Sequence, residues 1–189
     1  IIDDIDQVLE AIDWEGDSRA YDRREELRAM RIAAEALIAY AQRHALLLEE
    51  MAGREEDPTR AGELLRMAAI CRRVPAYAPT TFHEALQHYW FIHLGVITEL
   101  NPWDSFNPGR LDQHLAPFFE KEKSEGTLTR DQAAELLQSF WVKFNNHPAP
   151  PKVGITALES NTYTDFALIN VGGVREDGSD GVSEMSYLL

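Results

Sequence analysis

The sequence predicts an α/β chain that is mainly helical, with a few buried strands near its C-terminal end. Apolar residues recur every three or four positions over most of residues 1–150, as they do on one face of a helix. After residue 150 the pattern becomes extended and includes an apolar run of strand length. A chain of 189 residues, 44% of them hydrophobic, can bury a core. We expect one domain, helical over 1–150, with strands and a following helix over 151–189.

Two helices are predicted in the first third of the chain. Small and apolar residues at helical spacing, with Arg and Glu on the other face, predict a long amphipathic helix from about Tyr21 to Met51. Gly53 is expected to end it. The next helix is expected to begin at Asp57 and Pro58, because Asp caps free backbone N–H groups and Pro fits the first helical position.

The most apolar helix is predicted to follow a proline-rich connector. Thr81 with Glu84 three residues later has the form of a capping box and opens the stretch FHEALQHYWFIHLGVITEL. Between Tyr89 and Ile97 this helix is apolar nearly all round, so we expect neighbours to cover every side.

Two more helices and the strands complete the predicted order. Asn107 and Pro108 are expected to open one helix, and Thr129 with Gln132 to open another. Strands are expected at 153–156 and 163–171, the second buried on both faces. The glycine pair of INVGG is interpreted as a turn at the end of that strand, and 183–189 as the start of a further helix.

Charge and cysteine content limit the partners and the compartment. The 32 acidic against 18 basic residues give a net charge of -14, which argues against nucleic acid or a membrane as partner. The single cysteine, Cys71, suits a reducing compartment, and the acidic stretch Ile1–Glu10 is unlike a signal peptide. We therefore expect a cytoplasmic protein. SEMSYLL ends within an apolar pattern and the first residue is not Met, so we expect a piece of a longer chain.

The histidines and the cysteine do not form a predicted metal or catalytic centre. His83, His88 and His93 are five residues apart, and each step turns the side chain by roughly 140°, so the three do not share a helix face. Cys71 lies near the end of a helix with no local partner base, and we interpret it as a packed side chain. No metal site is predicted.

Two polar segments are the candidate substrate-binding regions. In NPWDSFNPGRLDQHL, two prolines brace Trp103, Asp104 and Ser105, which combine apolar wall with hydrogen-bonding groups as ligand pockets do. ESNTYTDFALIN shows the same mixture; its candidates are Tyr163, Asp165 and Asn170. We expect both segments to face one cavity. Local features favour equally the alternative that the first loop only plugs a helix end.

The order of these blocks resembles the glycyl radical enzymes, the family of pyruvate formate-lyase and the radical diol dehydratases. TFHEALQHYWFIHL, PGRLDQHLAPFFEKE, TRDQAAELLQSFWVKFN, INVGG and SEMSYLL occur in the family's order. The resemblance implies a ten-stranded barrel of two antiparallel five-stranded halves, jacketed by helices. Residues 1–189 would then be an internal fragment of one pyruvate formate-lyase-like domain.

The resemblance also implies a radical mechanism whose reacting groups lie outside these residues. In the family a glycyl radical generates a cysteine thiyl radical, which takes hydrogen from the substrate. Neither the RVxGY-like nor the CVE-like motif occurs here, and Cys71 in AICRRVP is not the family's cysteine. No catalytic residue and no bound cofactor are therefore predicted within this segment. The implied partners are a small-molecule substrate, an activating enzyme with S-adenosylmethionine and an iron–sulfur cluster, and a second copy of the full-length protein.

The loop residues shape the substrate expectation. Ser105 matches a substrate-contacting serine of the dehydratases, whereas Asp104 replaces their histidine, which puts a diol or glycerol in doubt. The resemblance favours radical C–S or C–C cleavage of a small anion: isethionate sulfite-lyase first, arylacetate decarboxylase or diol dehydratase next. Arg110 is the arginine beside these clusters, and further cations would come from elsewhere. The alternative is a non-catalytic, acidic helical module that binds another protein.

Overall fold

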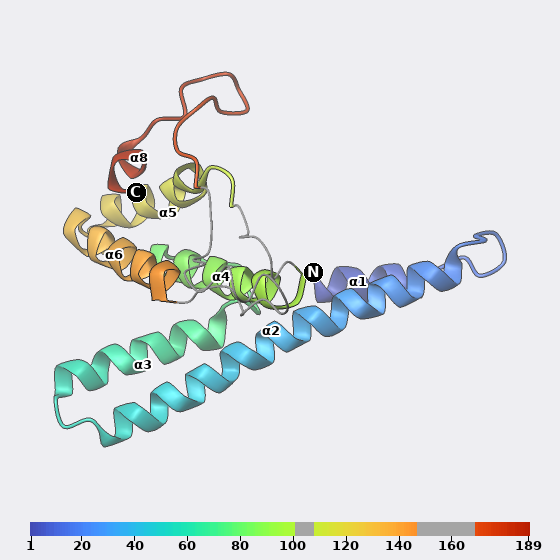
Figure 1. The fold of residues 1–189 in the computed structure, drawn as a ribbon, viewed down its shortest axis with the longest axis horizontal. Coiled ribbons are helices and arrows are strands. Elements are labelled where there is room, and N and C mark those ends of the chain that lie inside the picture. Colours follow the sequence, from blue (N-terminus) through green and yellow to red (C-terminus); the bar gives the residue numbers. More distant parts are fainter. Residues whose placement is uncertain (101–107, 147–168) are drawn as a thin grey trace, which may run out of the picture. The chain divides into compact units, whose positions relative to one another are not determined.

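The computed structural model of the 189-residue chain is shown in Figure 1. The structure describes residues 1–100, 108–146 and 169–189. Within these ranges the chain is mainly helical and forms two compact units, Ile1–Arg72 and Arg73–Leu189. The extended pairing found in them consists of two isolated bridges, Arg110 with Asn170 and Val174 with Asp180. The expected strands at 153–156 and most of 163–171 lie outside the described residues, and the single domain stays a prediction.

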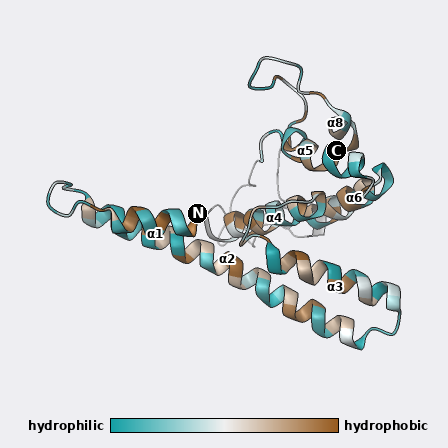
Figure 2. Cartoon of the chain, turned by 180° about the vertical axis from the view of Figure 1, so that it is seen from behind, coloured by the Kyte–Doolittle hydropathy of each residue, from teal (hydrophilic) through white to brown (hydrophobic). Residues whose placement is uncertain are grey.

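The first unit is built on one long helix. It contains α1 (Ile2–Glu10), α2 (Ala20–Arg54) and α3, which runs from Pro58 to Arg73 and so ends at the unit boundary. Helix α1 was not predicted; it packs along α2 with Ile5 buried, and Asp6 pairs with Arg31. Hydrophilic and hydrophobic residues alternate along α2 (Figure 2), as its predicted amphipathic pattern requires.

The predicted junction between α2 and α3 is largely confirmed. Asp57 Oδ1 accepts a hydrogen bond from the Thr59 backbone N at 2.8 Å, so Asp57 caps α3 as expected. Gly53, however, lies inside α2, which continues to Arg54. The prediction placed the end early because an isolated glycine lowers helix propensity without ending a helix.

A two-point ion pair joins α3 to α2. Arg72 Nε lies 2.7 Å from Glu49 Oε1, and Arg72 Nη2 lies 2.6 Å from Glu49 Oε2. This pairing raises the pKa of Arg72 and lowers that of Glu49. Because both side chains reach solvent, the pair fixes orientation more than it stabilises.

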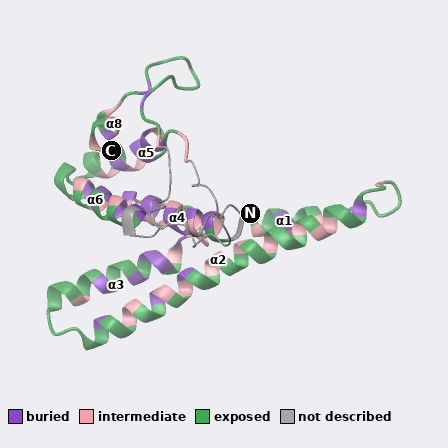
Figure 3. Ribbon diagram, viewed as in Figure 1, coloured by how far each residue is buried: buried purple, intermediate pink, exposed green. Residues whose placement is uncertain are grey.

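The second unit holds the hydrophobic core. It contains α4 (Phe82–Gly95), a π-helix η1 (Val96–Leu100), α5 (Leu111–Glu125), α6 (Arg130–Asn146) and α8 (Glu184–Leu188). Buried residues lie along α4, α5 and α6 (Figure 3). Every residue from Tyr89 to Ile97 is buried or half-buried, which confirms the predicted burial of this stretch. No helix among the described residues combines the length and apolarity needed to cross a membrane.

Aromatic side chains join α4 to α6. Trp90 meets Phe144 edge to face at 5.3 Å between ring centroids, and Phe140 meets Phe144 at 4.8 Å. Such edge contacts add to the free energy gained from burying the rings. His93, wholly buried, lies among them, 4.8 Å from the Phe144 ring centroid.

The helix starts of the second unit mostly follow the predicted caps. Thr129 Oγ1 accepts from Gln132 N at 3.2 Å and Gln132 Oε1 accepts from Thr129 N at 2.9 Å, a complete capping box. At α4 the box is half made: Thr81 Oγ1 accepts from Glu84 N at 3.2 Å, as predicted. The Glu84 carboxylate instead accepts from Thr80 N at 2.7 Å. Burial opposes ionisation of Glu84, yet bonds from Thr80 and the nearby Arg73 charge lower its pKa overall.

Two predictions near the glycines are wrong: the start of the helix after the connector and the burial of Val171. Helix α5 begins at Leu111 rather than at Asn107 and Pro108, because Gly109 is left-handed (φ 71°) and Arg110 pairs with Asn170. Val171 was expected to be buried on a two-sided strand, but it is 50% exposed. The chain turns at Gly172, so the pairing does not continue past Asn170.

Gly126 supplies a test of the helix-ending turn. It follows α5 with φ 72°, and a Cβ there would have no atom within 4 Å. Gly126→Ala should therefore lower the free energy of unfolding by about 1 kcal/mol through backbone strain alone.

Gly62→Ala is the matched control, because Gly62 lies inside α3, also with open space around it. This change should raise the free energy of unfolding by roughly 0.5–1 kcal/mol. Urea denaturation followed by circular dichroism measures both, and equal effects of the two changes would contradict the backbone explanation.

Candidate functional site

The six candidate substrate-binding residues divide by where the structure describes them. Asn170 is described and exposed. The other five lie outside the described residues: Trp103, Asp104, Ser105, Tyr163 and Asp165. Their positions therefore stay predictions. The geometry of the site is described from the neighbouring residues of each polar segment that the structure describes.

The structure brings together one described position from each polar segment: Gly109 and Arg110 of the first, and Asn170 at the end of the second. Asn170 N donates a hydrogen bond to Gly109 O at 3.2 Å, and Arg110 and Asn170 form a parallel bridge. In a parallel bridge both chains run in the same direction. The chain that leads into Arg110 and the chain that leads into Asn170 therefore enter this junction from the same side.

The side chain of Asp112 binds the chain next to this junction. It is wholly buried in the first turn of α5. Its Oδ2 accepts hydrogen bonds from Gly172 N at 2.7 Å and from Ser186 Oγ of α8, and its Oδ1 accepts from Gln113 N at 2.8 Å. Both carboxyl oxygens thereby have internal donors, as buried polar groups require. Its oxygens are engaged in structure and not presented to a ligand.

Gln113 and Arg110 bind the turn that follows Asn170. Gln113 Nε2 donates to Gly172 O at 2.7 Å, while Gly172 N donates to Asp112. Two neighbouring side chains therefore bind both backbone polar groups of Gly172. Arg110 donates to Val174 O, and its guanidinium lies within 3.1 Å of where a Gly173 Cβ would be. The Arg110 side chain therefore points to this turn and stabilises it.

Glycines make this close packing possible. Gly172 and Gly173 have φ of 66° and 81°, which confirms the turn expected at the end of INVGG. A Cβ at Gly181 would lie 2.3 Å from Gln113 Nε2, so a side chain there would displace the amide.

A π-helix stands at the other side of the first polar segment. η1 ends at Leu100, directly before Asn101, and Thr98 Oγ1 donates to Leu94 O at 2.6 Å. π-Helical turns are rare and often occur beside functional sites. Its position supports a site at the connector, but the sequence carried no signal for it.

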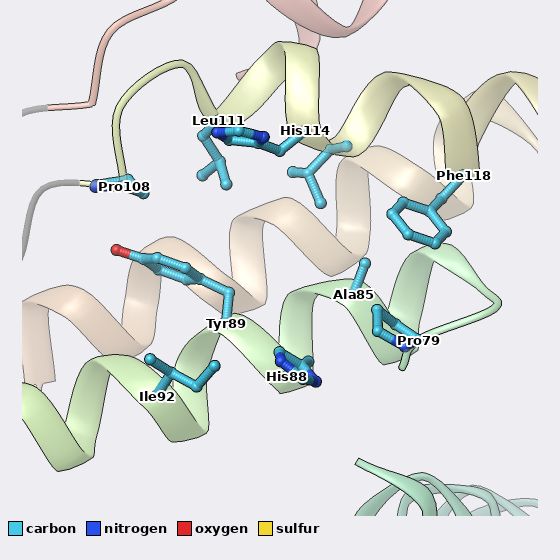
Figure 4. Close-up of a pocket in the computed structure, with 10 residues that line it drawn as sticks. Pro79, Ala85, His88, Tyr89, Ile92, Pro108, Leu111, His114 and Phe118 are labelled. Carbon is cyan, nitrogen blue, oxygen red and sulfur yellow. The ribbon is translucent and has the colours of Figure 1, made fainter. Parts of the chain in front are cut away.

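An apolar groove lies between α4 and α5, next to the same connector. It has a volume of about 300 Å³. Its lining residues are mostly apolar: Pro79, Ala85, His88, Tyr89, Ile92, Pro108, Leu111, His114, Leu115 and Phe118. Figure 4 shows the hydroxyl end of Tyr89 on the Pro108 side of the groove. Tyr89 Oη is 3.3 Å from His93 Nδ1.

The three α4 histidines face different surroundings, as their spacing predicted. His83 lies beside Leu136 and Phe140 of α6, His88 lines the groove with α5, and His93 lies in the aromatic cluster. Over the described ranges, no group of three or more His, Cys, Asp or Glu side chains could hold a metal ion. Cys71 is buried in α3, as expected of a packed side chain.

The comparisons with known proteins identify the family. The family model "Pyruvate formate lyase-like" matches residues 1–189. The chain belongs to the pyruvate formate lyase-like family. Its relatives include a dehydratase, a sulfite-lyase and a protein named a glycyl radical enzyme, so the family resemblance is confirmed.

Two curated relatives show the range of activities in the family. A trans-4-hydroxy-L-proline dehydratase of Clostridioides difficile is 53% identical over 98% of this chain and 24% of its own length. An isethionate sulfite-lyase of Nitratidesulfovibrio vulgaris is 36% identical over 89% of this chain and 20% of its own length. The chain thus spans about a quarter of the length of such relatives.

Solved structures confirm the predicted fold class. Hydroxyproline dehydratase from C. difficile, solved with trans-4-hydroxy-L-proline bound, matches with a TM-score of 0.92, 52% identity and coverage of 99% of this chain and 24% of that one. A glycyl radical enzyme from Archaeoglobus fulgidus matches with a TM-score of 0.84 and 31% identity over 99% of this chain and 24% of that one. The mainly helical chain therefore corresponds to one segment of these larger enzyme folds.

Asp112, Gln113 and Ser186 were not predicted from the sequence to be joined by hydrogen bonds. GRLDQ was noted as a family block, without a physical role for its carboxylate. One signal could have found it: Asp112 shares a helix face with the apolar Ala116 and Phe119, at spacings of four and seven residues. A carboxylate on such a face needs internal donors.

His88 gives the groove a pH-dependent signature. Burial lowers the pKa of His88, and its Nδ1 is buried with no hydrogen-bond partner among the described residues. Its unfolded-state pKa is about 6.5, so as pH falls below this value the unfolded chain takes up a proton that the folded chain binds less readily. The wild type should lose more stability than His88→Gln between about pH 7 and pH 5.

Urea denaturation of both proteins across this pH range measures the difference. Above the unfolded-state pKa the two curves should run parallel, which provides the internal control. Parallel curves over the whole range would contradict the assigned burial of His88.

Proposed function

We propose that the full-length protein containing this chain is a glycyl radical dehydratase of trans-4-hydroxy-L-proline or a closely related hydroxylated cyclic amino acid. The supporting observation is the 53% identity over nearly the whole chain to a protein of that name. This identity exceeds that to the isethionate sulfite-lyase by 17 percentage points, from 53% and 36%.

Isethionate C–S cleavage, which the loop residues favoured from sequence alone, is the second candidate. Asp104 in place of the dehydratase histidine and the 36% identical sulfite-lyase support it. Arylacetate decarboxylation and diol dehydration rank below it. The ranking changes because identity over the whole segment samples many more positions than one loop does.

The substrate site is proposed at the two polar segments, with Trp103, Asp104, Ser105, Tyr163, Asp165 and Asn170 as binding residues. Its support is the parallel bridge at Arg110 and Asn170, since Ser105 and Asp165 each precede a bridge partner by five residues. Five residues span at most roughly 18 Å, so neither side chain can be remote from the junction.

Each side chain has a distinct task in this proposal. Trp103 and Tyr163 supply apolar wall, which excludes water from a reactive intermediate, while Ser105 and the carboxylates orient the polar groups of the substrate. The radical and the thiol belong to other parts of the full-length protein and supply hydrogen abstraction. Loss of hydroxide as water from a hydroxylated substrate also needs a proton donor, and no role in that step is assigned to the described residues.

The partners follow from the same proposal. The glycyl radical would be installed by an activating enzyme that uses S-adenosylmethionine and an iron–sulfur cluster, and the full-length protein would be a cytoplasmic homodimer. A non-catalytic acidic module is the competing proposal for the isolated 189 residues. It requires that these residues alone stay monodisperse in light scattering and helical by circular dichroism, whereas aggregation would count against it, since unpaired strand edges promote association.

Anaerobic assay of the activated full-length enzyme tests the function and the site together. We expect turnover of trans-4-hydroxy-L-proline in preference to isethionate, arylacetates and glycerol. Ser105→Ala should lower kcat/KM by about tenfold or more, because a buried hydrogen bond to the substrate is lost, and Trp103→Ala by a similar factor.

The control variant is Gly62→Ala, inside α3, where the backbone is helical and a Cβ meets no atom within 4 Å. It should leave kcat/KM unchanged. If Ser105→Ala and Trp103→Ala also leave turnover unchanged, the proposed site is wrong. Turnover of isethionate alone would reject the dehydratase and support the second candidate.

A further inference from the structure

Three segments of the second unit meet at one buried carboxylate. Asp112 has no solvent exposure. Its oxygens accept hydrogen bonds from Gln113 N in α5, from Gly172 N in the turn after Asn170, and from Ser186 Oγ in α8. Segments separated by 60 and 74 residues in the sequence are thus fixed to one side chain.

These bonds fix register as well as contact. A buried hydrogen bond that shifts by one residue leaves donors and acceptors unpaired, so it specifies register in a way that apolar contact does not. Gln113 Nε2 adds a second bond to Gly172 O at 2.7 Å, and Gly181 N bonds Gly173 O at 2.7 Å. The turn has one position relative to α5 in which all these groups are satisfied.

The register fixed at Gly172 extends to the junction two residues earlier. Asn170 N bonds Gly109 O at 3.2 Å, and Arg110 lies in the parallel bridge with Asn170. Asp112 itself follows Arg110 by two residues. The carboxylate is therefore bonded to the chain two residues from the point where the two chains meet.

We propose that Asp112 is a positioning residue for the substrate site proposed above, and this inference rests on that proposed function. Its carboxylate sets the register of Gly109 and Arg110 against Asn170, and so sets the separation of the two groups of binding residues. Asp112 acts through the backbone of these residues and does not touch the substrate.

The competing role is general stabilisation, and α5 offers a matched control for it. Glu122 lies on the same helix, and its Oε2 also accepts from a backbone N–H, that of Phe82, at 2.6 Å. This bond joins α5 to the start of α4, away from the junction. Glu122→Gln therefore makes the same change from carboxylate to amide at a bond to a backbone N–H, without changing the register at Asn170.

The experiment measures substrate binding to the full-length protein before activation, so that radical formation does not enter. Isothermal titration with trans-4-hydroxy-L-proline compares the wild type with Asp112→Asn, Ser186→Ala and Glu122→Gln, and the Tm of each is recorded. Asp112→Asn should weaken Kd by about tenfold, because the binding residues would no longer be held at the separation that the substrate needs. Ser186→Ala, which keeps the carboxylate and two of its donors, should weaken Kd less and preserve folding.

The outcomes separate this inference from the function on which it rests. A Kd unchanged in Asp112→Asn, or changed equally in Glu122→Gln at a similar loss of Tm, would reduce Asp112 to a stabilising residue. If the wild type binds neither trans-4-hydroxy-L-proline nor isethionate, the proposed function fails instead. Amide hydrogen exchange then decides the register: Asp112→Asn should speed exchange at Asn170 and Gly172 while Glu122→Gln does not, and unchanged exchange would overturn the inference.

Discussion

A carboxylate buried without water must be surrounded by hydrogen-bond donors, and in this chain the arrangement of the second unit depends on that requirement at Asp112. The donors come from α5, from the turn after Asn170 and from α8. The α8 helix has only five residues and could not be stable alone. It is held by Met185 in the core and by the Ser186 bond to Asp112.

The apolar core and the hydrogen bonds around Asp112 and Gly172 contribute to the structure in different ways. The aromatic side chains of α4 and α6 belong to the hydrophobic core, but such packing tolerates small displacements. The hydrogen bonds around Gly172 do not, because each one needs a particular partner. A radical enzyme requires both properties, since its site has to exclude water and hold a substrate in a fixed orientation.

The substrate inference shows how local and global signals differ in weight. Asp104 puts a diol or glycerol substrate in doubt, and the residues of both polar segments together favour isethionate cleavage by resemblance. The comparison over the whole chain gives greater identity to a hydroxyproline dehydratase. The two signals differ on the substrate and agree on the family.

The sequence by itself determined the local elements and the family. Helix starts at Asp57, Thr81 and Thr129 were predictable because a cap depends on residues within one turn of it, and the burial of Tyr89–Ile97 followed from its composition. The tertiary structure alone decided where α5 begins, that Val171 reaches solvent, and that Arg110 braces the turn at Val174. It also decided that Gly109 meets Asn170, because a hydrogen bond across 61 positions leaves no periodic trace in the sequence. The chemistry of the candidate binding residues is visible in the sequence, whereas the proposal that they share one site rests on this long-range pairing.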